Sequence, residues 1–176
     1  MDQREISREQ MAQRVAWFRD LKPSAVPLLD AVLPPYRREI LSIIGSSVTE
    51  DADVRPAISA VEGFHLSIVR AAPGKGTALH NHKTVEVFMP LTGRWSFQWG
   101  GRAENEITLG QYDVVSIPHG VMRGFRNEGE GEALLLVIVG GTDPGRVAWN
   151  DEVLDAAKAK GFGFDPAGNI VGLGES

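Results

Sequence analysis

The chain contains no cysteine, and this absence excludes several classes of protein. Disulfide-stapled scaffolds, zinc sites built on thiolates and iron–sulfur clusters all need cysteine side chains. The 176 residues are enough to bury one sizeable hydrophobic core, so the fold does not depend on a cross-link or a metal ion for its stability. These properties predict a single globular domain and are typical of a reducing compartment.

Long apolar runs and an excess of positive charge are also missing. No stretch approaches the roughly 18 apolar residues of a membrane-spanning helix, and the chain starts with the charged sequence MDQREISREQ. With 18 Lys and Arg against 23 Asp and Glu, the net charge of −5 argues against a surface that binds nucleic acid. We therefore expect a cytoplasmic protein that binds a small molecule, with neither a membrane nor a nucleic acid as its partner.

Strand patterns dominate residues 57–140. Large apolar side chains alternate with other residues at 64–69 and at 95–99, which is the period of two that strands produce. Residues 134–139 form a continuous apolar run, which is typical of a strand buried on both faces. Short strands separated by glycine turns predict an all-β core arranged as a sandwich or barrel.

Helical patterns flank the strands. Ser7 begins a capping box, and apolar residues follow at helical spacing up to Pro23, so we expect a first helix over residues 7–21 that packs on the barrel. The prolines that follow leave room only for short helical pieces, at residues 28–33 and 36–44.

A last short helix is expected near the end of the chain. Asn150 or Asp151 can cap it, and Gly161 is placed to end it before an extended, glycine-rich tail. The predicted organisation has three parts: an N-terminal helical extension at residues 1–56, a barrel at residues 57–141, and a C-terminal helix and tail at residues 142–176.

The segment PGKGTALHNHKTVEVFMPLTG places two imidazoles and a carboxylate at short spacings. Side chains alternate faces along a strand, so His80, His82 and Glu86 face the same way if the strand runs unbroken. Gly74 and Gly93 permit tight turns on either side, because glycine takes positive φ at little cost. Two histidines and one carboxylate with open positions favour non-haem iron(II), while zinc, manganese and nickel are compatible alternatives. The segment predicts one bound divalent metal ion.

This segment resembles the first conserved motif of the cupin family at every defining position. A second segment, LGQYDVVSIPHGVMRGFRN, resembles the second cupin motif. Its markers are the opening Gly110, the turn residues Pro118 and Gly120, and the closing Asn127. The resemblance covers approximately residues 60–140. It implies a cupin jelly-roll β-barrel with the metal site inside, flanked by the N-terminal helical segment and the short C-terminal helix.

Arg123 stands where the family usually carries a third metal-binding histidine. A guanidinium offers only hydrogen-bond donors, so it cannot be a metal ligand. Either it points into the barrel and binds an anionic group of the substrate, or it occupies the place of the metal and pairs with Glu86. His119 lies between the turn residues of the second motif, where the resemblance assigns it to the turn rather than to the metal. Arg123 and His119 are the candidate catalytic residues, with His119 acting on substrate at the barrel mouth.

Three classes of function are compatible with these residues. In the preferred class, the three ligands hold iron(II) with positions open for O₂ and substrate, and the protein is an oxygenase or dioxygenase of a small anionic organic compound. In the second, a divalent metal stabilises an enediolate in an isomerase of a sugar or keto acid. In the third, the barrel binds a small ligand without turnover. Cupins include all three classes, so the resemblance does not choose among them.

The remaining features concern packing and assembly. His65 lies on a strand face with a serine, and a hydrogen-bonded, partly buried histidine explains it without any chemistry. Trp95, Phe97 and Trp99 are interpreted as core side chains that can also line the pocket. We expect a homodimer, because the resemblance suggests a contact through the N-terminal segment or a barrel face and exposed sheet edges invite pairing.

Overall fold

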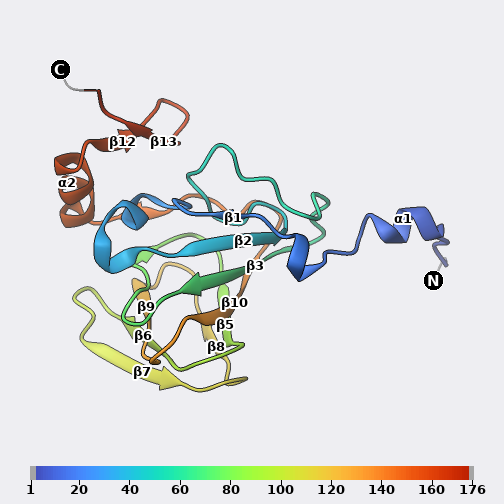
Figure 1. The fold of residues 1–176 in the computed structure, drawn as a ribbon, viewed down its shortest axis with the longest axis horizontal. Coiled ribbons are helices and arrows are strands. Elements are labelled where there is room, and N and C mark those ends of the chain that lie inside the picture. The colour runs from blue at the N-terminus through green and yellow to red at the C-terminus, as the bar shows by residue number, and fades with distance from the viewer. Residues whose placement is uncertain (1–2, 175–176) are drawn as a thin grey trace.

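Two antiparallel sheets make up the body of the protein in the computed structural model, which describes residues 3–174 (Figure 1). The larger sheet has the strand order β1-β2-β3-β10-β5-β8. Its strands are β1 (Pro23–Ser24), β2 (Glu39–Ile44), β3 (Phe64–Ala71), β5 (Glu86–Pro90), β8 (Val115–Ile117) and β10 (Ala133–Gly140). The smaller sheet has the order β11-β4-β9-β6-β7. Its strands are β4 (His80–Asn81), β6 (Trp95–Trp99), β7 (Asn105–Leu109), β9 (Arg123–Asn127) and β11 (Ala148–Trp149). The predicted all-β jelly-roll core is confirmed.

The two sheets enclose one hydrophobic core centred on aromatic side chains. Phe88 from β5, Phe97 from β6 and Phe125 from β9 pack with ring centroids 5.2 to 6.4 Å apart. Trp95 is also fully buried, whereas Trp99 is only half-buried. Burial of each phenylalanine contributes roughly 1.5–3 kcal/mol, so this cluster is a main source of attraction between the sheets.

The strand β10 lies between β3 and β5 in the larger sheet. Its side chains alternate between buried and half-buried from one end to the other. The prediction of a strand buried on both faces was therefore wrong, because only the inner face of this sheet packs against the second sheet. The outward leucines and isoleucine of the apolar run keep part of their surface exposed.

The N-terminal segment differs most from its prediction. The capping box at Ser7 is present, but helix α1 spans only Arg8–Ala12, and none of its residues is buried. A separate 3-10 helix, η1, follows at Phe18–Asp20, and Figure 1 shows α1 well away from the sheets. The prediction of one helix over residues 7–21 was therefore wrong, and so was the prediction that it packs on the barrel, because α1 is short and exposed. A helix this short gains little by itself and needs an apolar surface to rest on.

The segment before residue 57 contains both helical turns and a barrel strand. The 3-10 helices η2 (Leu29–Val32) and η3 (Pro34–Tyr36) agree with short helical pieces between prolines. The helix expected through residue 44 was wrong, because residues 39–44 form β2 and pair with β3. The isoleucines of this strand have branched Cβ atoms that suit a pleated surface. The larger sheet therefore begins inside the segment that was assigned to the N-terminal extension.

The C-terminal helix α2 (Asp151–Ala159) is confirmed, with the Asn150 side chain accepting a hydrogen bond from the Val153 N–H. Val153 packs in a small cluster with Leu33 and Ala78. The tail is not a simple extended arm, since β12 (Phe162–Phe164) and β13 (Ile170–Gly172) pair as a hairpin. Among residues 3–174, no helix combines the length and apolar character needed to cross a bilayer.

Two glycines shape the chain just before the first motif histidine. Gly74 has a φ of +70°, the left-handed conformation that glycine adopts without strain, and open space surrounds the position of its missing side chain. Gly76 lies instead against β9, where a Cβ would be 1.8 Å from the carbonyl oxygen of Phe125. The next residue, Thr77, donates its N–H to the same carbonyl at 2.9 Å. The backbone therefore enters the site pressed against the strand that carries Arg123.

Candidate metal centre

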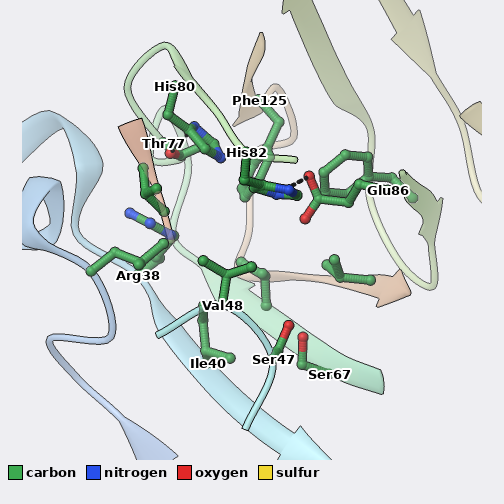
Figure 2. Close-up of a pocket in the computed structure, with 15 residues that line it drawn as sticks. Arg38, Ile40, Ser47, Val48, Ser67, Thr77, His80, His82, Glu86 and Phe125 are labelled. Carbon is green, nitrogen blue, oxygen red and sulfur yellow. Dashed lines mark hydrogen bonds and ion pairs between the residues drawn. The ribbon is translucent and has the colours of Figure 1, made fainter. Parts of the chain in front are cut away.

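The three predicted ligands come together, but not on one strand. His80 lies on β4 in the smaller sheet, Glu86 opens β5 in the larger sheet, and His82 lies in the connection between them. The prediction of an unbroken strand was wrong, because the chain crosses from one sheet to the other within these residues. One possible ligand atom from each side chain nevertheless lies within 4.8 Å of the others, and all three side chains are buried. The cluster is able to hold a metal ion between the two sheets (Figure 2).

Both imidazoles are oriented by hydrogen bonds at Nδ1. His80 Nδ1 is 2.8 Å from the carbonyl oxygen of Ala78, which can only accept, so this nitrogen carries the hydrogen. His82 Nδ1 is 2.8 Å from Thr84 Oγ1, and that hydroxyl donates to the carbonyl of Pro144 at 3.3 Å. The bond to Ala78 leaves His80 Nε2 unprotonated, which is the form that binds metals, and His82 Nε2 lies 3.3 Å from Glu86 Oε2.

The charges of the cluster also suit a divalent cation. Burial lowers the pKa of His80 to about 3, and the charge of Arg123 acts in the same direction, so the ring is neutral near pH 7. Burial alone would raise the pKa of Glu86, but the neighbouring His82 ring and the Arg123 guanidinium outweigh it and lower that pKa to about 2. The cluster therefore presents the His80 lone pair, the His82 imidazole and one carboxylate, a donor set that fits iron(II), zinc, manganese or nickel.

Arg123 occupies the centre of this cluster. Its side chain is buried, and Nη2 and Nε donate to the same Glu86 oxygen, Oε2, at 2.6 and 3.1 Å. Nη2 also contacts His82 Nε2, and Nη1 donates at 3.4 Å to the carbonyls of His80 and Val121. The guanidinium thus points inward, as both interpretations of this residue required. A metal bound by all three ligands would require the guanidinium to withdraw from His82 and Glu86.

His119 and His65 lie outside the cluster. His119 is exposed in the turn between β8 and β9, and the structure does not bring it to the metal ligands. His65 is buried, accepts a hydrogen bond from the Ser47 N–H at 3.2 Å, and donates to the carbonyl of Thr142 at 3.2 Å. The interpretation of His65 as a hydrogen-bonded structural histidine is confirmed.

A cavity of about 30 Å³ adjoins the metal ligands. Most of its wall is apolar, and Figure 2 shows Ser47 and Ser67 on the side opposite His82 and Glu86. Phe88 and Phe125 contribute to the wall, whereas Trp95, Phe97 and Trp99, interpreted as core side chains that can also line the pocket, do not. This volume accommodates water but not an organic substrate of several atoms. A ligand of that size would fit only if side chains lining the cavity moved.

Several residues that support the site were missed in the sequence. Trp149 on β11 pairs with His80, and the two ring centroids are 5.5 Å apart. The indole N–H of Trp149 donates to Glu50 Oε1 at 2.9 Å, and the Leu29 N–H donates to Oε2 at 2.6 Å. Burial outweighs these bonds and raises the pKa of Glu50 to about 7. One signal of further support was visible in the sequence. It is Asp30, a charged residue within the otherwise apolar run LLDAVL.

The chain has recognisable relatives. Residues 67–139 match the model of the cupin domain, and no curated protein matches. The polyketide cyclase RemF from Streptomyces resistomycificus has a TM-score of 0.59 at 16% identity, with 82% of this chain and 92% of that chain covered. A cupin 2 domain-containing protein from Halorhodospira halophila has a TM-score of 0.52 at 20% identity, with 69% and 77% covered. Oxalate decarboxylase from Lactobacillus farciminis has a TM-score of 0.55 at 18% identity, with 78% and 36% covered.

The domain match covers the part of the molecule that carries the candidate metal ligands. Residues 67–139 run from within β3 to within β10 and include both motif segments. At these identities the solved structures share the fold alone. The antiparallel barrel and the histidine and glutamate cluster between its sheets agree with the match of residues 67–139 to the cupin domain.

Proposed function

We propose that the chain is an iron(II)-dependent oxygenase or dioxygenase of a small anionic organic substrate. The observation that carries the proposal is the convergence of two imidazoles and one ionised carboxylate, all buried, within 4.8 Å. When bound, iron(II) would supply a redox-active centre with coordination positions that the protein leaves open. His80, His82 and Glu86 would hold it, and the bonds at each Nδ1 would keep the imidazoles aimed at it.

Arg123 supports the assignment of an anionic substrate. Its carboxylate partner in the structure is Glu86. If Glu86 turns to a metal ion, the guanidinium stays buried without a counter-ion, which costs several kcal/mol. A carboxylate on the substrate would restore the pair with bidentate geometry. Metal binding and anion binding would then favour each other through the same side chain.

The bond between Arg123 and Glu86 also supports a second candidate, a small-ligand-binding cupin without metal or turnover. In that protein the guanidinium takes the place of the cation and neutralises the carboxylate permanently. No comparable observation favours a metal-dependent isomerase. Proton transfer in such an enzyme needs a base near the substrate, and His119 is exposed in its turn.

Metal binding gives the first test. Anaerobic titration near neutral pH should show one iron(II) bound per subunit, and His82→Ala should weaken binding by about a hundredfold or more, because a coordinating imidazole is lost. His119→Ala is the matched control, since this exposed histidine should leave the affinity unchanged. Calorimetry that detects no iron(II) binding, or an equal loss of affinity in the two variants, would refute the metal site.

Oxygen consumption tests the proposed reaction. The iron-loaded protein should consume oxygen with at least one member of a panel of small carboxylic acids. No oxygen consumption with any of them would refute the oxygenase.

We also propose that the protein is a homodimer held partly by its N-terminal segment. Large apolar side chains of this segment are between 42% and 61% exposed. They are Ile6, Met11, Val15, Trp17 and Phe18. Such an apolar stripe on a projecting arm fits a surface that a second copy covers. Light scattering should give twice the chain mass of 19.1 kDa, and Trp17→Ser with Phe18→Ser should shift the mass toward one chain. A mass of one chain for the unmodified protein at micromolar concentration would disprove the dimer.

A further inference from the structure

A buried ion pair lies behind His80, on the side away from Glu86. Asp30 comes from η2 and Arg38 from the residues just before β2, and their side chains are 0% and 1% exposed. Arg38 Nη2 is 2.9 Å from Asp30 Oδ1. Both residues are distant in sequence from the metal-ligand motif, and neither contacts the proposed metal ligands directly.

The pair binds three consecutive residues that lead into β4. Asp30 Oδ2 accepts hydrogen bonds from the Thr77 hydroxyl and from the Ala78 N–H, each at 2.9 Å. Arg38 Nη1 donates to the carbonyl of Gly76 at 3.2 Å. Asp30 thus binds the N–H of Ala78, and the carbonyl oxygen of the same residue accepts the hydrogen bond from His80 Nδ1 at 2.8 Å. Figure 2 shows Arg38, Thr77 and His80 along the same side of the cavity.

The stability of the fold does not explain this arrangement. Removing two charges from water costs several kcal/mol per ion, and an apolar pair of similar volume is often equally stable. The hydrogen bonding of this pair is also incomplete, since Arg38 Nε has no hydrogen-bond partner in the described chain and Asp30 Oδ1 has only the ion-pair contact with Arg38 Nη2. What the pair does achieve is a fixed position for residues 76–78. Trp149 packs against the His80 ring from β11 but makes no hydrogen bond to it, so it cannot select a tautomer.

We propose that Asp30 and Arg38 are positioning residues for His80. By fixing the Ala78 carbonyl, they keep the hydrogen on His80 Nδ1 and leave Nε2 as the lone pair that faces the cavity. The consequence for metal affinity rests on the proposed function, whereas the consequence for the tautomer does not. Partners of this kind typically change metal affinity by about ten- to a hundredfold when they are removed.

The test compares two double variants that differ in one hydrogen-bond acceptor. Asp30→Asn with Arg38→Met keeps an oxygen for Thr77 and Ala78, while Asp30→Leu with Arg38→Met offers methyl groups of similar volume. Neither variant leaves a charge buried alone, so both should fold. Imidazole nitrogen NMR shifts of the metal-free, isotope-labelled protein report the His80 tautomer, and zinc titration reports the affinity.

We expect His80 to be protonated at Nδ1 in the unmodified protein and in the asparagine variant. The leucine variant should show a mixture of tautomers and about ten- to a hundredfold weaker zinc binding. An Nε2-protonated His80 in the unmodified protein, or one unchanged tautomer in all three proteins, would overturn the proposal. Loss of folding in both variants would also overturn it, because the pair would then serve the fold itself. If zinc does not bind the unmodified protein, the proposed function fails, and the tautomer still decides this inference.

Discussion

Replacing Arg123 with histidine should tighten zinc binding by about a hundredfold or more. The substitution removes the guanidinium that bonds to Glu86 and contacts His82, and a hydrogen bond to a charged group contributes roughly 1.5–3 kcal/mol, or about ten- to a hundredfold in affinity. It also adds an imidazole at the position that pairs directly with His80 across β4 and β9. Zinc titration of the purified proteins measures the change.

Arg123→Ala separates the two proposed roles of this arginine. If the unmodified protein already binds metal and Arg123 serves the substrate, the alanine variant should keep its metal and bind small carboxylates about ten- to a hundredfold more weakly. If Arg123 replaces the metal, the alanine variant should bind metal where the unmodified protein does not. The account of this site is wrong if neither the alanine nor the histidine variant alters metal uptake or carboxylate binding.

Glu50 should make the protein lose stability as the pH rises from about 5 to 8. Its pKa is about 7 in the folded protein, above the ordinary glutamate value of 4.5, because burial disfavours the charged form. The protonated carboxyl therefore favours folding below the unfolded pKa, and this contribution is lost as the pH rises through the folded pKa. The difference between the two pKa values corresponds to roughly 3 kcal/mol in total, of which about 2 to 3 kcal/mol falls in this interval.

Urea unfolding of the unmodified protein and of Glu50→Gln, followed across this pH range, isolates that contribution. Glutamine does not titrate, and its oxygen can still accept from either Leu29 or Trp149. The difference in unfolding free energy between the two proteins should therefore shift in favour of glutamine by about 2 to 3 kcal/mol between pH 5 and 8. A difference that stays constant with pH would show that Glu50 has no raised pKa in the folded protein.

The parts of the fold that could be predicted are those set by local patterns. Alternating residues at 64–69 and 95–99 identified strands, although in β3 the more buried face carries His65, Ser67 and Val69, and in β6 Ser96 is as buried as its aromatic neighbours. The capping side chains of both helices were visible as well. Residues 39–44 were assigned incorrectly because their strand character depends on pairing with β3. Helix α1 ends at Ala12, and none of its residues is buried against the rest of the described chain.

The same distinction between local patterns and long-range contacts applies to the candidate site. His80, His82 and Glu86 are close in sequence, so their spacing alone indicated a common site, even though the strand between them is broken. Arg123 was found through the resemblance to a family motif. Asp30 was noticeable as a charge in an apolar run, but its partners and those of Glu50 could not be predicted, because these contacts arise only when separate segments fold against the residues around His80.

Gly74 and Gly76 are subject to different limits as sequences diverge. At position 74 the requirement is a backbone angle, and asparagine, which tolerates positive φ better than most residues, is an acceptable replacement in evolution. At position 76 the requirement is space, because any side chain would begin 1.8 Å from the Phe125 carbonyl oxygen. Every replacement there would separate the approach to His80 from the strand of Arg123. A related sequence can therefore carry another residue at position 74 and keep this site, whereas a replacement at position 76 would disrupt it.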